Sequence, residues 1–113
     1  MIDFYDFGKI KINGKDYQED VIIYPDKVFS PWWRKEGHFL EIDDLPEDVL
    51  EAKVDTIIIG TGYSGLMKVS SEVKNYFKNK KIEVIIEPTK SAWKTYNQLS
   101  KTKKVIALFH LTC

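Results

Sequence analysis

The first thirty residues alternate between apolar and polar side chains, as expected for strands with one buried face. Residues 10–12 place two isoleucines on one face, and Asn13-Gly14 follows as a hairpin signal, because both central positions of a type I′ turn need positive φ. A return strand over 17–24 and a third short strand at 28–29 complete the pattern. We therefore expect an N-terminal antiparallel β-meander.

Three later segments carry apolar side chains at the three-to-four-residue spacing of an amphipathic helix. The first is expected to start after Asp44, as its cap, and to continue to about Lys53. The second follows a serine cap at Ser70 or Ser71, and the third follows Thr89, its expected cap.

Apolar runs separate these helices and predict the strands of a central sheet. The run from Thr56 to Ile59 is apolar on both faces, which suits a central strand covered by helices on each side. Further strands are expected at 82–87 and 105–112. This β-α-β-α-β order favours parallel pairing through right-handed crossovers. We expect one α/β domain over residues 1–113, with the meander extending or covering the sheet.

Charge and cysteine content narrow the functional class. Seventeen basic residues balance seventeen acidic ones, so the chain lacks the positive surface of a dedicated nucleic-acid binder. The single cysteine, Cys113, cannot form an internal disulfide, and no apolar stretch approaches the roughly 18 residues of a membrane span. Two histidines and one cysteine without ligand spacing do not predict a metal site. A cytoplasmic protein without membrane association is expected.

Three glycines, Gly60, Gly62 and Gly65, match the G-x-G-x-x-G pattern of dinucleotide-binding turns. Glu87 ends the following strand, where an acidic ribose ligand would lie. However, residues 66–69 read as extended rather than helical, and the expected strands amount to about half of a dinucleotide fold. A glycine-rich turn packed against a neighbour is the simpler interpretation, with a nucleotide, another anion or a small ligand as the alternative.

His110 and Cys113 lie close enough in sequence to suggest a base and a nucleophile. Strand alternation places His110 on the face of Leu108 and Cys113 on the face of Phe109, which opposes their pairing. A chain end can bend away from that rule, so the chemical role of both residues stays open. Without a nucleophile–base–orienter set, the sequence leans away from an enzyme and predicts no cofactor.

Residues 30–40 hold two adjacent tryptophans, Trp32 and Trp33, the sole arginine, Arg34, and one histidine, His38. No clear period covers this stretch, which predicts a structured loop. Tryptophan and arginine dominate the energetics of protein interfaces, so these four residues predict a partner-binding surface. The competing interpretation is that Trp33 covers the edge of the core while Arg34 pairs with a carboxylate or with carbonyls at a helix end. Both interpretations can hold at once.

Several motifs together resemble one known family. They are Phe7-Gly8-x-Ile, Asn13-Gly14, Tyr17-x-x-Asp20, Trp33-Arg34-x-x-Gly37-His38, Gly60-Thr-Gly62-x-x-Gly65, Thr89-x-x-Ala92-x-x-x-Tyr96-Asn97-x-Leu99 and His110-Leu-Thr-Cys113. The chain is similar in these motifs to the adipogenesis-associated Mth-like domain family, a domain of unknown function whose animal relatives include a mitochondrial respiratory complex I assembly factor. The resemblance implies a three-layer α/β fold with a mixed central sheet whose last strand is antiparallel to the others.

The resemblance supplies no catalytic residues, but it marks positions where a ligand would bind. These are Gly60, Thr61, Gly62, Gly65 and Thr89. The sequence favours a small non-enzymatic binding or assembly module for an unidentified protein partner, and a homo-oligomer is compatible with it. The alternative is a ligand-binding protein or enzyme that uses the glycine stretch. Because no targeting segment is evident at the N-terminus, a bacterial or archaeal cytosolic member is expected rather than a mitochondrial one.

Overall fold

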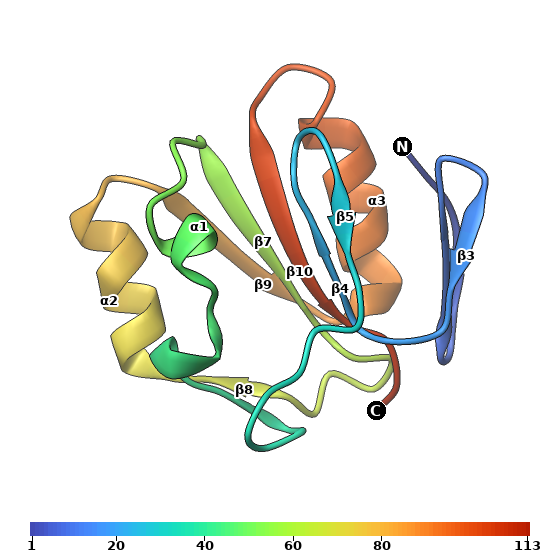
Figure 1. The fold of residues 1–113 in the computed structure, drawn as a ribbon, viewed down its shortest axis with the longest axis horizontal. Helices are drawn as coiled ribbons and strands as arrows, with labels where there is room; N and C mark the ends of the chain where they lie inside the picture. The colour runs from blue at the N-terminus through green and yellow to red at the C-terminus, as the bar shows by residue number, and fades with distance from the viewer.

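The computed structural model describes residues 1–113 as a three-layer α/β fold (Figure 1). A five-stranded mixed sheet forms the middle layer. In spatial order its strands are β5 (Val28–Phe29), β4 (Val21–Ile23), β10 (Val105–His110), β7 (Thr56–Thr61) and β9 (Glu83–Glu87). All six residues of β7 and all six of β10 are buried, which confirms the expected central strand.

The strand directions decide between the two expectations for the end of the chain. β10 is parallel to β7, with Ala107 beside Ile58, and β7 is parallel to β9. Only β4 and β5 run against their neighbours. The β-α-β-α-β pattern therefore predicted the last strand correctly. The antiparallel last strand implied by the family resemblance is wrong, because α3 carries the chain back to the edge of the sheet at which β7 also starts.

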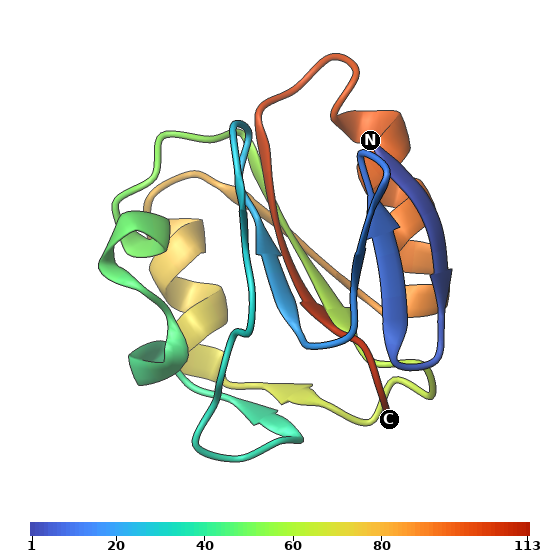
Figure 2. The same ribbon diagram turned by 45° about the vertical axis from the view of Figure 1, so that its right-hand side comes forward.

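A separate three-stranded antiparallel sheet precedes the central one. It contains β1 (Ile2–Asp6), β2 (Lys9–Ile12) and β3 (Lys15–Tyr17), and the predicted turn at Asn13-Gly14 joins the last two with both residues at positive φ. The return strand expected over 17–24 is divided between β3 of this sheet and β4 of the central sheet. Three consecutive polar residues, Gln18-Glu19-Asp20, interrupt the apolar pattern where the chain leaves one sheet for the other, so the single return strand was wrong. Figure 2 shows the small sheet beside α3.

Helix α2 (Ser71–Asn79) starts as expected, because the Ser70 hydroxyl accepts the N–H of Val73 at 3.2 Å. Helix α3 (Thr89–Leu99) includes its expected cap residue, Thr89, as its first helical residue, and Pro88 takes the N-cap position. The Thr89 hydroxyl does not cap the helix, because it donates to the carbonyl oxygen of His110.

The first expected helix is shorter than its spacing suggests. It consists of a 3-10 turn, η1 (Ile42–Asp44), followed by the single-turn α1 (Glu47–Leu50). The Asp44 carboxylate does not cap α1; it accepts the backbone N–H groups of Glu41 and Lys35 instead. Two short parallel strands, β6 (Phe39–Leu40) and β8 (Lys68–Val69), pair beside this segment, so the extended geometry expected near 66–69 is confirmed for β8.

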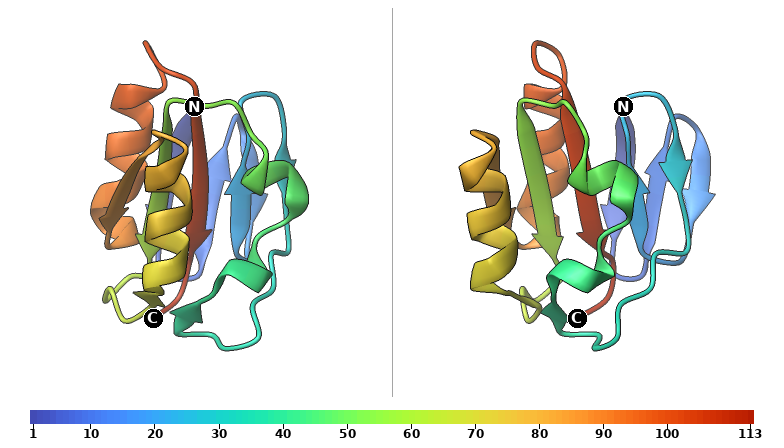
Figure 3. Two further views of the ribbon diagram at one scale, coloured as in Figure 1. Left: turned by 90° about the vertical axis from the view of Figure 1, so that its left-hand side faces the viewer. Right: turned by 60° about the vertical axis from the view of Figure 1, so that its left-hand side comes forward.

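The core lies on both faces of the central sheet. On one face Ile57 and Ile59 pack with α1 and α2, and on the other face Ile58 packs with α3 and the N-terminal sheet. The right-hand view of Figure 3 shows α2 and the N-terminal sheet on opposite sides of the central strands. None of the helices is both long and apolar enough to cross a membrane.

Candidate functional site

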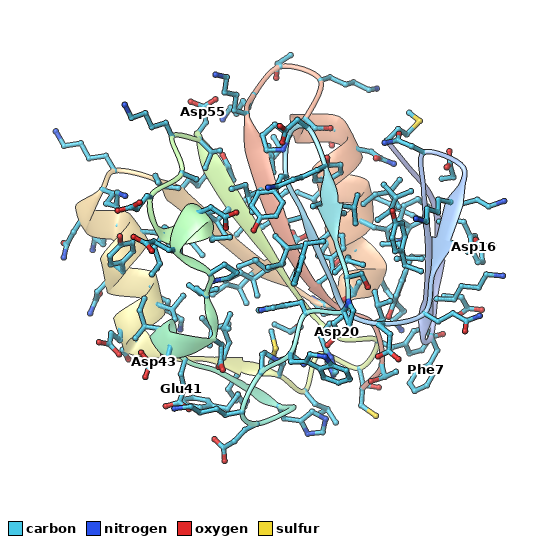
Figure 4. All side chains as sticks on the ribbon, viewed as in Figure 1. Phe7, Asp16, Asp20, Glu41, Asp43 and Asp55 are labelled. Carbon is cyan, nitrogen blue, oxygen red and sulfur yellow. The ribbon has the colours of Figure 1, made fainter.

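Residues far apart in sequence meet at the carboxyl edge of the parallel strands. His110 ends β10 at this edge, and Asp20 reaches the same edge just before β4, because Val21 pairs antiparallel with Phe109. Figure 4 labels Asp20 at this lower edge of the sheet. In open α/β sheets, ligands bind outside the carboxyl ends of the strands. Two features lie at this edge: the glycine turn after β7 and a cluster of charged side chains.

The glycine turn is filled by the protein itself. Gly62 has φ of +101°, and a Cβ there would lie 2.5 Å from the backbone carbonyl carbon of Cys113. At Gly60 a Cβ would lie 2.7 Å from the Thr89 hydroxyl and 2.8 Å from the ring of Phe109. The glycines therefore allow the end of the chain and the start of α3 to approach β7 closely, and Gly65, at φ of +71°, packs against Pro88.

Thr89 and Thr61 connect the strand ends beside this turn. The buried Thr89 hydroxyl donates to the carbonyl oxygen of His110 at 2.7 Å and accepts the N–H of Gly62 at 2.9 Å. The Thr61 hydroxyl donates to the carbonyl oxygen of Glu87 at 3.2 Å. The structure has five surface cavities, and none is lined by a residue between 60 and 65 or by Thr89.

The charged cluster is built around the Asp20 carboxylate. Its Oδ2 lies 2.8 Å from Nη2 of Arg34 and 2.8 Å from Nδ1 of His110, while its Oδ1 accepts the N–H of Leu111 at 2.7 Å. The three side chains are only 16%, 4% and 7% exposed for Asp20, Arg34 and His110 respectively. The guanidinium lies over the Trp32 ring, 4.8 Å from its centroid, which is a favourable cation–π geometry.

These contacts keep the Asp20 carboxylate ionised. Burial raises the pKa of Asp20, but the hydrogen bonds from His110 and Leu111 and the neighbouring positive charge of Arg34 outweigh burial and hold that pKa below its ordinary value. An ionised carboxylate only accepts hydrogen bonds, so we assign a proton to Nδ1 of His110, which donates it to Asp20. Nη2 of Arg34 lies 3.0 Å from the same Nδ1. In the neutral ring, Nε2 of His110 is then a hydrogen-bond acceptor.

Three nitrogens of this cluster are buried without a hydrogen-bond partner in the protein. They are Nε and Nη1 of Arg34 and Nε2 of His110. Most buried polar groups in native proteins are paired, so these three nitrogens are exceptions that call for an explanation. Both side chains line a cavity of about 300 Å³, at the lower end of the range for small-ligand pockets. The other lining residues are Gln18, Glu19, Asp20, Trp32, Trp33, Gly37 and Thr112.

The four residues predicted to bind a partner occupy different environments. Trp32 is 3% exposed, and its indole N–H donates to the carbonyl oxygen of Asp44 at 3.0 Å, whereas Trp33 is 72% exposed. The expectation that Trp33 covers the core edge is therefore wrong, because Trp32 fills that position. The expected pairing of Arg34 with a carboxylate is confirmed. His38 is exposed, with its ring centroid 5.9 Å from that of His110.

Sequence reasoning gave no role to Asp20, although it lies within a quoted family motif. Its position in the polar stretch Gln18-Glu19-Asp20 directly before an apolar strand is the only local signal, and the neighbouring residues share it. The structure brings together Asp20, Arg34 and His110, and His110 directs Nδ1 at the carboxylate. Cys113 is a half-buried free thiol, and no hydrogen bond joins its side chain to His110.

Replacing Asp20 with asparagine is expected to give a pH-dependent loss of stability. Because the folded-state pKa of Asp20 lies below its ordinary 3.8, its charge stabilises the fold fully above about pH 4, and this contribution decreases as the pH falls through the folded-state pKa. Urea unfolding should therefore show a larger difference between wild type and Asp20→Asn at pH 6 than at about pH 3.

The matched control for this pH comparison is Asp43→Asn. Asp43 is an exposed carboxylate whose only ion pair, with Lys35 at 3.8 Å, is equally exposed, so its removal should change the free energy of unfolding little at either pH. A difference between wild type and Asp20→Asn that does not shrink at low pH would contradict the assignment of Asp20 as a charged partner in the cluster.

Solved structures share this fold over their full lengths. A conserved hypothetical protein from Pyrococcus horikoshii OT3 is 31% identical with a TM-score of 0.84, and the match covers 100% of this chain and 99% of that one. A protein named MT938 is 30% identical with a TM-score of 0.80, covering 100% and 98%. A structure described as an outer membrane protein from Bartonella henselae is 23% identical with a TM-score of 0.82 over 99% and 94%, a likeness of fold alone.

A family model agrees with these structural matches. The model is described as a protein of unknown function and matches residues 2–110, which include both the glycine turn and the charged cluster. The match therefore covers nearly the whole fold rather than a single motif. The chain belongs to the DUF498/DUF598 family of proteins of unknown function.

Proposed function

We propose that this chain is a small cytosolic, non-enzymatic protein-binding or assembly module that docks an unidentified partner through the loop of residues 30–38. The observation that carries this proposal is the contrast between neighbouring residues of that loop. Trp33 is 72% exposed, while the side chains of Trp32 and Arg34 on either side of it are buried. Exposed tryptophan side chains held by a firm support are typical anchors of protein interfaces.

The loop is held in place before any partner arrives. The Trp32 backbone N–H donates to the carbonyl oxygen of Asp20 at 2.9 Å, and Arg34 donates to the carbonyl oxygen of Gly37 at 3.0 Å as well as to the Asp20 carboxylate. The Lys35 N–H donates to the Asp44 carboxylate at 3.0 Å. A loop that is already ordered loses less conformational entropy on binding, which favours affinity.

The family resemblance supports an assembly role. The adipogenesis-associated Mth-like domains, which the sequence resembles, include an assembly factor for respiratory complex I among their animal relatives. A scaffolding role of this kind needs a docking surface and no catalytic set. A second copy of this chain is one candidate partner, alongside a different protein.

Small-ligand binding is a second candidate function, and the observation that favours it lies beside Arg34. The cavity there is lined by the two side chains that carry the three unpaired buried nitrogens. A nucleotide or other anion at the glycine turn is a weaker form of this proposal, because such a ligand would have to displace the backbone of Thr112 and Cys113 from Gly62.

Replacing Trp33 is the direct test of the docking proposal. A photo-crosslinking amino acid at position 35 of the full chain, where the lysine side chain is 69% exposed in the same loop, would identify the partner in source cells with Trp33 intact. The purified partner would then be titrated with wild type and with Trp33→Ala by calorimetry. We expect Trp33→Ala to weaken binding at least about thirtyfold, as loss of an interface hot spot does. Its free energy of unfolding should change by less than about 0.5 kcal/mol, since the side chain is exposed.

The matched control for the docking test is Phe4→Ala. Phe4 is 48% exposed but lies on β1 of the separate N-terminal sheet, so its removal should leave the affinity for the partner unchanged. Equal affinity of wild type and the Trp33→Ala variant for the partner captured through this loop would overturn the proposed docking loop.

A further inference from the structure

We infer that the cavity beside Arg34 and His110 receives a main-chain amide of a partner polypeptide. In this arrangement the carbonyl oxygen of the amide accepts hydrogen bonds from Arg34, and the N–H of the same segment donates to Nε2 of His110. The inference deepens the proposed function and rests on it in one respect: the amide belongs to the partner that Trp33 anchors.

Arg34 supplies the donors for a carbonyl oxygen. Its Nη2 is occupied by the Asp20 carboxylate at 2.8 Å and by the carbonyl oxygen of Gly37 at 3.0 Å. Its Nε and Nη1 are buried and have no acceptor within the protein. A guanidinium cannot lose its protons in a protein, so these two nitrogens remain donors under all ordinary conditions. The cavity therefore requires an acceptor from its occupant.

His110 supplies the complementary acceptor. Its Nδ1 lies 2.8 Å from the Asp20 carboxylate and 3.0 Å from Nη2 of Arg34. In the neutral tautomer whose Nδ1–H donates to the carboxylate, Nε2 has a free lone pair. That Nε2 is buried and has no donor within the protein. An occupant that both accepts near Arg34 and donates near His110 satisfies the two side chains together. A peptide group has this combination of C=O and N–H in every residue except proline.

The charge around the cavity favours an uncharged occupant over an anion. The positive charge of Arg34 is already balanced by Asp20 at 2.8 Å, and the carboxylate of Glu19 adds a further negative charge to the lining. A carboxylate or phosphate entering here would meet a lining that is net negative. An amide meets no such repulsion, because it offers its carbonyl oxygen as a neutral acceptor.

The surroundings of the cavity suit a polypeptide rather than a free small molecule. Its wall includes Trp33, whose exposed ring can contact an apolar side chain next to the bound amide. Gly37 also lines the cavity and, having no side chain, leaves room there for a polypeptide backbone. The volume of about 300 Å³ accommodates a short segment rather than a large cofactor.

The inference can be tested on the full chain by nuclear magnetic resonance. Uniformly ¹⁵N-labelled protein at neutral pH would be titrated with N-acetylglycine N-methylamide and, separately, with N-acetylglycine as its carboxylate. The Nε–H signal of Arg34 is unambiguous because the chain has one arginine, and His38 provides an internal reference for the ring nitrogens of His110. The amide should shift Nε–H of Arg34 and Nε2 of His110, with a dissociation constant on the order of 10 mM, as a fragment of this size implies.

The carboxylate probe separates an amide site from an anion site. We expect it to bind roughly fivefold more weakly than the amide, and the Glu19→Gln variant should reduce that gap while leaving the amide affinity unchanged. Tighter binding of the carboxylate than of the amide would replace the inference with an anion site. Saturating shifts confined to other residues, or no shifts at 100 mM (about tenfold the expected constant) of either probe, would overturn it.

The titration tests the amide site separately from the docking loop, so either proposal can be overturned while the other is kept. Shifts at Arg34 and His110 with no effect of Trp33→Ala on partner binding would overturn the docking loop and keep the amide site. Partner binding that depends on Trp33 without shifts at these nitrogens would keep the docking loop and overturn the amide site.

Discussion

Replacing Gly62 with valine is expected to destabilise the fold by roughly 2–6 kcal/mol, a large part of the total stability of a domain of this size. Two effects add. At φ of +101° an L side chain is strained, which costs roughly 1–3 kcal/mol, and a β-branched residue is least tolerant of it. A side chain would also meet the backbone of Thr112 and Cys113 at 2.5–2.6 Å, and overpacking of this kind costs a similar amount. Urea unfolding followed by tryptophan fluorescence measures the loss.

Two controls separate strain from collision. Gly14 also has positive φ, at +82°, but a Cβ there meets nothing within 4 Å, so Gly14→Val should show the strain cost alone. In a chain shortened by residues 112–113, the collision partner of Gly62 is gone, and Gly62→Val should cost about as much as Gly14→Val. If Gly62→Val costs the same in the full and shortened chains, the packing explanation of this glycine is wrong.

The central strand and the glycine bend could be predicted because their signals are local. The run from Thr56 to Ile59 is β-branched at every position and has no charged residue, which suits a strand covered on both faces, and the glycines follow it directly. The serine cap of α2 is likewise decided by residues within one turn, since Ser70 and Val73 are three positions apart. Each of these features depends on neighbours in sequence.

The charged cluster could not be predicted, because its members are distant in sequence. Asp20 and His110 are 90 positions apart, and no periodicity relates them. The roles of Trp32 and Trp33 were inverted for a different reason. Two adjacent residues of the same type carry no local signal for which one points inward, and the loop that holds them has no period. Their orientation is set by the Asp44 carbonyl and by Asp20, which lie in other segments.

Replacing Arg34 with methionine is expected to destabilise the fold by roughly 3 kcal/mol. Methionine preserves much of the apolar stem but removes the charge that balances Asp20, and removing one member of a buried ion pair leaves the other uncompensated. The Asp20 side chain is 16% exposed, so water compensates part of the loss. The cost should therefore lie at the low end of the roughly 3–5 kcal/mol that removal of one partner of a buried ion pair costs. Urea unfolding at neutral pH measures it.

A double-mutant cycle shows whether the destabilisation by Arg34→Met comes from leaving the Asp20 carboxylate without its ion-pair partner. Asp20→Asn removes the carboxylate charge that Arg34→Met would leave unpaired. The loss of unfolding free energy in the double variant should therefore be smaller than the sum of the two single losses, by roughly 0.5–3 kcal/mol. Additive losses would mean that Arg34 stabilises the fold through its stacking on Trp32 rather than through Asp20. The coupling matters for the proposed function, because the ion pair with Asp20 also holds Arg34 in a position where Nε and Nη1 have no acceptor in the protein. The ion pair therefore supports the loop that carries Trp33 and, in the same loop, leaves the two unpaired Arg34 nitrogens to which we assign the bound amide.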